Sequence, residues 1–420
     1  MQLGIGLGIW FGVFLALGAG RAAAEPPPPP PTDAPPPQPS PESRKTREFN
    51  IAPLVGGNSD IGAGIGQISN VSGLGPGIEP YRWQLESSGF ISFLPHDGGV
   101  VVPLQDYFVA FHLPDLGAHH VRFDVRASYT LEKTLLFYGI GNASKVPAGG
   151  PSDDTEFGRL HPALSIQGRV PVYRDVYVNA GSVTSYNRLD VPATSILASY
   201  ATQGPADARP FIGPFTAHTT EVLALGVQYD TRDHEIDTRN GQFHAAQVRY
   251  SPKIGSALPY GYERVTLIAR VYRGVTDRVT LSARLVGDVV LGDAPFYELA
   301  RYEETPAIGG INAVRGVPAY RYYGKVKAFG NLEARSDLFG FHLFGKKLKL
   351  GAAAFFDAGR TWTELLHAHP DLDGTGVGLK YGIGGGLRLQ QGATFVLRAD
   401  LAYSPDARPV GAYFTANQIF

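Results

Sequence analysis

The stretch from Ile308 to Phe339 reads IGGINAVRGVPAYRYYGKVKAFGNLEARSDLF. It begins with two glycines and then sets one arginine between an apolar residue and a glycine. The residues of this motif are Gly309, Gly310, Val314, Arg315 and Gly316. Arginine makes bidentate hydrogen bonds to a carboxylate that lysine cannot reproduce, and the glycine beside it allows a tight turn. The stretch therefore predicts a tight loop whose arginine needs an acidic partner.

On either side of this stretch the sequence alternates between apolar and polar residues. His120 to Glu132 and Thr394 to Ser404 each place apolar side chains on one face and charged or polar ones on the other. A period of two indicates strands, and helical patterns are nearly absent. Because the strands look long, we predict an all-β fold, a transmembrane antiparallel β-barrel of about 16 strands at about 10 residues each. The barrel must close, since an open sheet edge in lipid leaves backbone groups unpaired.

The composition excludes several classes of protein. The chain has 420 residues, a formal net charge of −1 and no cysteine. The charge is not that of a nucleic-acid-binding protein, and the lack of cysteine excludes disulfides, thiolate catalysis and cysteine-based zinc sites. The 52 glycines, 21 tyrosines and 23 phenylalanines suit turns, twisted strands and aromatic girdles at a membrane interface.

The N-terminal part divides into two segments before the barrel. Residues 1–24 contain an apolar run and end in three alanines, which predicts a signal peptide, with an uncleaved membrane anchor as the alternative. Residues 25–48 are dominated by proline and predict an extended periplasmic linker, either a stiff spacer or a ligand for a periplasmic partner. The barrel is then expected to occupy residues 49–420.

Four local patterns follow one another in a recognisable order. They are Tyr229–Phe243, Gly309–Gly316, Asn331–Arg335 and Phe355–Trp362. Together they resemble the BamA/TamA superfamily of outer-membrane assembly factors, of the bacterial surface antigen type. The resemblance implies that the Val-Arg-Gly loop folds back into the barrel lumen. It also implies that Arg315 meets an acceptor strand carrying Asp357 and Gly359, with Glu333 as a second acceptor.

The two ends of the barrel segment bear on the same resemblance. Phe420 is the last residue and Phe414 lies on the same face of the last strand, which resembles the C-terminal assembly signal of outer-membrane barrels. Members of the superfamily usually carry POTRA domains before the barrel, whereas the proline-rich segment stands there in this sequence. The sequence thus resembles a short, POTRA-less member.

Other polar clusters offer weaker site hypotheses. An acidic turn could bind calcium but is better interpreted as a solvated turn; its residues are Asp230, Asp233, Glu235 and Asp237. His367 and His369 could bind a metal but are better interpreted as loop residues. Since no catalytic triad, phosphate-binding loop or ligand set emerges, we predict no enzyme, no catalytic residue, no cofactor and no metal.

These observations predict an integral protein of the Gram-negative outer membrane that is exported by its signal peptide. Its expected partners are outer-membrane lipids and, by resemblance, unfolded outer-membrane proteins or the barrel-assembly machinery, with no nucleic acid. The resemblance implies insertion or translocation of proteins or lipids through a weak seam between the first and last strands, near Phe49–Gly66 and Ala412–Phe420. The alternative is a passive channel or a surface-exposed structural barrel. The sequence assigns neither a client nor an oligomeric state.

Overall fold

A computed structural model describes residues 47–75, 78–96, 98–117, 120–147, 152–234, 237–343, 346–391, 395–406, 410–416 and 418. The signal-peptide and linker predictions therefore lie outside the described residues, except at the linker's last two positions. Among the described residues, no helix is long and apolar enough to cross a membrane.

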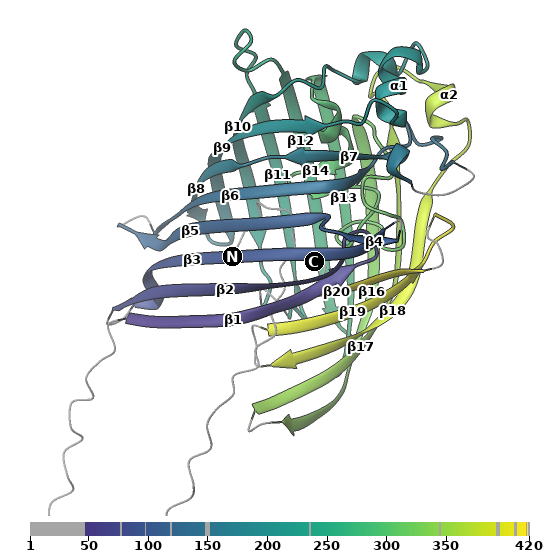
Figure 1. The fold of residues 1–420 in the computed structure, drawn as a ribbon. Coiled ribbons are helices and arrows are strands. Elements are labelled where there is room, and N and C mark those ends of the chain that lie inside the picture. The colour runs from purple at the N-terminus through teal and green to yellow at the C-terminus, as the bar shows by residue number, and fades with distance from the viewer. Residues whose placement is uncertain are drawn as a thin grey trace, which may run out of the picture.

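The described strands form one antiparallel sheet that closes on itself (Figure 1). Its first half contains β1 (Arg47–Asn58), β2 (Gly62–Gly75), β3 (Ile78–His96), β4 (Gly99–Val101), β5 (Leu104–Leu116), β6 (Val121–Leu136), β7 (Glu156–Leu160), β8 (Ala163–Tyr173) and β9 (Val176–Asp190). Its second half contains β10 (His218–Asp230), β11 (Gly241–Ser251), β12 (Gly261–Gly274), β13 (Val279–Asp293), β16 (Val326–Leu343), β17 (Lys346–Trp362), β18 (Lys380–Gln391), β19 (Phe395–Tyr403) and β20 (Gly411–Ala416).

Two of these segments do not count as separate strands of the barrel wall. β4 pairs only with the end of β3, and β7 continues β8, because both pair with β6 on one side and β9 on the other. The described strands therefore make a closed barrel with 16 strands in its wall, which confirms the predicted fold. The first strand begins at Arg47, close to the expected start of the barrel.

The alternation in the sequence becomes an inner and an outer face. On β10, Leu223, Leu225 and Val227 point outward and are 47–60% exposed. On β12 and β13 the inward residues include Arg264, Thr266 and Asp288, all at most 2% exposed. An apolar outer face matches the lipid core of a membrane, and polar side chains gather inside where they can pair with one another.

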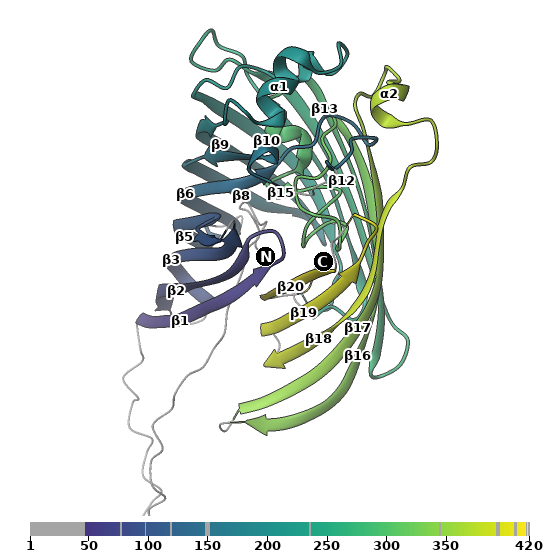
Figure 2. The ribbon, with the colours of Figure 1, turned by 45° about the vertical axis from the view of Figure 1, so that its right-hand side comes forward.

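The connection between β13 and β16, residues 294–325, runs into the lumen (Figure 2). We call it the inner loop. It contains a 3-10 turn (Phe296–Ala300) and the short hairpin β14 (Arg301–Tyr302) and β15 (Thr305–Pro306). Its apolar residues Ile308, Val314 and Val317 are fully buried against Phe329 and other inward-facing side chains of the wall. The inner loop is thus packed as part of a core.

The long connections meet at one end of the barrel. That end carries α1 (Ile196–Gln203), α2 (Pro370–Asp373) and the 3-10 turns Asp153–Thr155 and Arg209–Phe211. Phe137, Leu197, Phe296, Tyr323 and Leu372, from several of these connections and the inner loop, share one apolar cluster. The cluster forms a cap over this end of the lumen.

Candidate functional site

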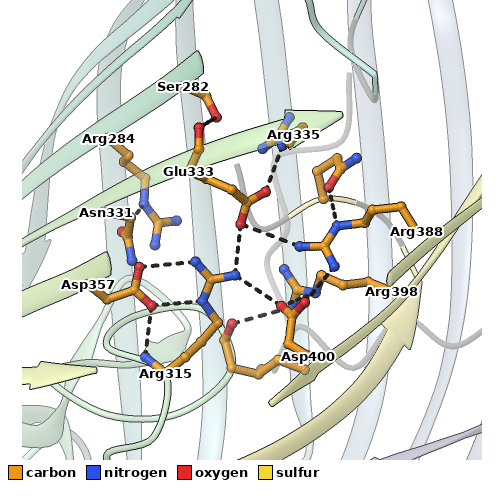
Figure 3. Close-up of polar contacts among 12 residues, drawn as sticks. Ser282, Arg284, Arg315, Asn331, Glu333, Arg335, Asp357, Arg388, Arg398 and Asp400 are labelled. Atoms are coloured by element: carbon orange, nitrogen blue, oxygen red, sulfur yellow. Dashed lines mark hydrogen bonds and ion pairs between the residues drawn. The ribbon is translucent and has the colours of Figure 1, made fainter. Parts of the chain in front are cut away.

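Arg315 of the inner loop lies fully buried against the inner face of β16, β17 and β19 (Figure 3). Its Nε–H and Nη2–H donate to Asp357 Oδ2 and Oδ1 at 2.7 and 3.0 Å, and its backbone N–H donates to Oδ2 at 3.1 Å. Its Nη1–H groups donate to Glu333 Oε2 at 2.8 Å and Asp400 Oδ2 at 3.0 Å. One guanidinium therefore joins three carboxylates on three strands.

The backbone around Arg315 fits the wall closely. Gly316 has φ +92°, a conformation that disfavours other residues, and its N–H donates to the Tyr413 hydroxyl at 2.7 Å. The Arg315 guanidinium carbon also lies 3.3 Å from the centroid of the Phe355 ring. Because Tyr413 belongs to β20, the tip of the inner loop also contacts the last strand of the wall.

Further arginines surround the three carboxylates. Arg335 Nε–H donates to Glu333 Oε1 at 2.7 Å, and Arg388 Nη1–H donates to Asp400 Oδ1 at 2.5 Å. Arg398 lies 3.5 Å from Asp400. With Arg315, Glu333 and Asp357, these residues form what we call the arginine cluster. Each carboxylate contacts at least one guanidinium, which is the arrangement a buried charge requires.

Asn331 and Arg284 hold the backbone of the loop just before its tip. Asn331 Nδ2–H donates to the Ala313 carbonyl at 2.7 Å, and Arg284 Nη2–H donates to the Asn312 carbonyl at 2.6 Å. Arg284 also donates to Asn331 Oδ1 at 2.9 Å. The strand motif around Glu333 thus binds both the side chain and the backbone of the loop.

Most of the other predicted site residues pack tightly against neighbouring backbone or side chains. Val314 is fully buried. A Cβ on Gly309 would lie 2.1 Å from the Pro318 carbonyl oxygen, Gly310 has φ +93°, and a Cβ on Gly359 would lie 2.6 Å from Cβ of Phe329. Phe414 points outward from β20 and is 37% exposed. Phe420 lies outside the described residues.

Sequence reasoning missed a second anchor of the inner loop, on β12, which only β13 separates from β16 in the wall. Arg264 Nη1–H donates to Glu298 Oε2 at 3.0 Å, and Arg264 Nη2–H donates to the Glu298 carbonyl at 2.7 Å. Asp288 is fully buried, and Lys327 Nζ lies 3.1 Å from its Oδ2. The sequence did carry a signal for this anchor. Arg264 and Asp288 lie in segments of alternating apolar and polar residues, at positions on the polar face.

The inner loop also makes polar contacts with β6. The Tyr320 hydroxyl donates to Glu132 Oε1 at 3.2 Å, and His161 Nε2 lies 3.0 Å from Glu132 Oε2. The loop is therefore held on β6 as well as on β12.

The weaker metal hypotheses involve residues that have other contacts. Asp230 pairs with Arg232 at 2.8 Å, Asp237 lies 3.3 Å from Lys349, and Glu235 lies outside the described residues. His369 lies 3.3 Å from Glu364, and His367 is exposed. Among the described residues, no group of three or more histidines and carboxylates could hold a metal ion.

The seam that closes the barrel is short. Among the described residues, which omit 417, 419 and 420, β1 and β20 share two register pairs, Gly57 with Phe414 and Asn58 with Tyr413, and the Ser59 N–H donates to the Ala412 carbonyl. By contrast, β1 pairs with β2 along its whole length, Arg47–Asn58. Gly62, Gly64 and Gly66, which the sequence placed near the seam, lie on β2, because the turn at residues 59–61 ends the first strand earlier.

The sequence of residues 215–420 matches the Omp85 superfamily domain. This part of the chain is an Omp85 domain. The match includes the inner loop, the arginine cluster and the last strand, and it confirms the family resemblance drawn from the sequence motifs. Omp85-family barrels are transporters and assembly factors, which agrees with the prediction that the chain is not an enzyme.

Solved Omp85-type barrels share the fold. The crystal structure of BamA from Haemophilus ducreyi lacking POTRA domains 1-3 gives a TM-score of 0.55 at 14% identity, covering 89% of this chain and 70% of that one. CdiB from Escherichia coli gives a TM-score of 0.53 at 14% identity, covering 87% of this chain and 62% of CdiB. CdiB from Acinetobacter baumannii gives 0.51 at 15% identity, covering 89% and 60%. No curated protein sequence matches the chain.

Proposed function

We propose that this outer-membrane Omp85-family barrel assists the insertion or translocation of polypeptides or lipids by opening the seam between β1 and β20. The observation that carries the proposal is that, within the part of the chain that the structure describes, this seam has two register pairs, against six between β19 and β20. Each missing backbone hydrogen bond lowers the cost of separating the two strands. The seam is therefore the part of the wall that separates at the lowest free-energy cost.

An open seam would present a template for another chain. Within the described residues, positions 47–56 of β1 have cross-strand partners on β2 and none on β20. A strand edge with unpaired N–H and C=O groups pairs readily with an incoming strand. A client strand could thus add to β1 without first displacing a long native partner.

Two further assignments belong to the same proposal. Residues 1–24 act as the signal peptide and residues 25–48 as the periplasmic linker, and Phe414 with Phe420 acts as the assembly signal of the barrel itself. The arginine cluster keeps the inner loop inside the lumen while the seam works. Its contact to Tyr413 on β20 supports a direct link between the loop and the seam.

A disulfide across the seam tests the mechanism, because the chain has no cysteine of its own. Ser59→Cys with Ala412→Cys would join the strands at their backbone contact. The barrel is reconstituted in liposomes. One assay follows the folding of a urea-unfolded eight-stranded outer-membrane barrel, and a second follows the flipping of a fluorescent phospholipid. Oxidation should stop whichever activity the barrel has, and reduction should restore it.

A matched disulfide within the wall controls for oxidation itself. Ala283 and Leu332 are register partners on β13 and β16, far from the seam in strand order. Cysteines at these positions should leave activity unchanged. Full activity in the oxidised Ser59–Ala412 variant would refute seam opening.

A further inference from the structure

A cavity of about 750 Å³ lies inside the barrel, between the inner loop and the strands next to the seam. The β1–β2 turn, the inner loop from Pro306 to Tyr322 and the segment before β20 line it. None of the carboxylates that bind Arg315 lines this cavity, so it is separate from the arginine cluster. Its size is typical of a site for a small molecule.

One wall of the cavity is apolar. It is formed by Ile61, Leu94, Leu104, Leu135 and Leu136, from the β1–β2 turn and from strands β3, β5 and β6. Leu104 belongs to a buried apolar cluster with Leu54 and Phe90, and Ile61 packs against that cluster. The same turn and β6 also bring Asp60 and Glu132 to the cavity, so this wall offers hydrocarbon contact beside two acidic groups.

Another wall carries two positive groups beside one aromatic ring. The guanidinium carbon of Arg321 lies 4.2 Å and Nζ of Lys380 lies 4.6 Å from the centroid of the Tyr322 ring. Arg321 uses Nη1 and Nη2 to hold Ser144, and its Nε has no hydrogen-bond partner although the residue is only 3% exposed. Within the described residues, Lys380 forms no hydrogen bond or ion pair. Both side chains line the cavity, and among the described residues each keeps a donor that makes no hydrogen bond.

Carboxylates near these cations are already engaged. Asp406 accepts from the Tyr322 hydroxyl at 2.7 Å, and the two oxygens of Glu132 contact Tyr320 and His161. Asp60, in the β1–β2 turn, also lines the cavity; burial raises its pKa to about 6, so it is still largely ionised at neutral pH. Glu156 also lines the cavity, at the start of β7. Beside the Tyr322 ring itself, the described groups without a hydrogen bond are Arg321 Nε and the Lys380 ammonium.

We infer that this cavity binds a single-chain amphiphile with an anionic head group, either a carboxylate or a phosphate. Lys380 and Arg321 receive the head group, because charge-assisted hydrogen bonds to an anion are the strongest ones these donors can make. The alkyl chain lies along the apolar wall, where it leaves water. The inference does not depend on seam opening.

Photoaffinity labelling tests the site directly. The full-length barrel in lipid nanodiscs is illuminated with a twelve-carbon fatty acid that carries a diazirine at the end of its chain, and labelled peptides are mapped by mass spectrometry. Labels should fall on Leu94, Leu104 or the Leu135–Leu136 pair. Excess dodecyl phosphate or dodecanoate should suppress these labels, and the better competitor identifies the head group, whereas dodecyltrimethylammonium should not compete.

Charge variants separate specific binding from partitioning into the bilayer. Lys380→Gln should reduce cavity labelling, and Lys380→Glu should reduce it by about tenfold or more, as expected for loss of a charge-assisted contact. Lys253→Glu is the matched control, because Lys253 is exposed and pairs with Asp293 at 3.3 Å, outside the cavity. Heat-modifiable gel migration verifies folding of each variant. Labels restricted to outward residues such as Leu223 and Leu225, or cavity labels unchanged in both Lys380 variants, would overturn the inference.

Discussion

Gly382 lies directly against the backbone of Arg315. A Cβ placed on Gly382 would stand 1.7 Å from the Arg315 carbonyl oxygen, less than any real contact allows. Gly382 is the register partner of Asp357, the carboxylate that binds the Arg315 side chain twice. A strand position without a side chain thus makes room for the loop beside its main acceptor.

Replacement of Gly382 by alanine should displace the inner loop from the wall. The added methyl group meets backbone rather than a flexible side chain, so we expect a loss of about 1–3 kcal/mol in the free energy of unfolding. Urea titration of the barrel in detergent or lipid measures this. Gly287→Ala is the control, because a Cβ there meets nothing within 4 Å. Equal stability of the two variants would contradict the close contact.

Removal of either partner of the Arg315–Asp357 pair should destabilise the barrel strongly. Arg315→Ala leaves three carboxylates with less positive charge around them, and Asp357→Ala leaves a buried guanidinium with two acceptors, each at a cost of about 3–5 kcal/mol. The double variant should cost less than the sum of the single ones, since the groups contact each other. Free energies of unfolding for the parent, the two single variants and the double variant give the coupling energy between Arg315 and Asp357. Strictly additive losses would show that the two side chains do not stabilise each other.

Loss of the second anchor should release a different part of the inner loop. Arg264→Met removes both hydrogen bonds to Glu298 and leaves that carboxylate without its main partner. Arg301, which follows Glu298 in the loop and is 1% exposed, should then become a trypsin site, whereas Arg315 should stay protected. Limited proteolysis with peptide mapping distinguishes the two sites. Simultaneous cleavage at both would show that the anchors are not independent.

The inner loop and the cap should keep the intact barrel from conducting ions freely. Fully buried loop residues such as Val314 and Tyr323 fill the lumen. Replacement of residues 296–323 by a short glycine-serine linker should therefore produce steady single-channel currents well above those of the intact barrel. Planar bilayer recordings compare the two proteins. Large steady currents from the intact barrel would instead support the passive-channel alternative.

The sequence predicted the features that depend on local pattern. Alternation placed the polar residues of Thr394–Ser404, which include Arg398 and Asp400, on one face of a strand, and motif resemblance paired Arg315 with Asp357 and Glu333. A period of two identifies the face of a strand but not the height of a residue along the barrel. That height depends on register, which turn length and bulges set.

The contacts that escaped prediction are those that depend on register. Arg388 reaches Glu333 across two strand boundaries, and Arg264 meets Glu298 at a distance of 34 positions along the chain. Neither pair belongs to a local motif. Only the structure identifies the Arg315 carbonyl as the group that approaches Gly382.

The inner loop is fixed at Glu298 to β12 and, through Gly316 and Tyr413, to β20, the last described strand of the wall. Any outward swing of β20 must carry the loop tip with it and straighten the residues between the two attachments. At roughly 3.5 Å per residue, a fully extended chain sets a hard ceiling on that excursion. The inner loop therefore limits the opening of the seam as well as filling the lumen. The length of chain between its two attachments determines how far β20 can separate from β1 before the contacts at Glu298 or Tyr413 break.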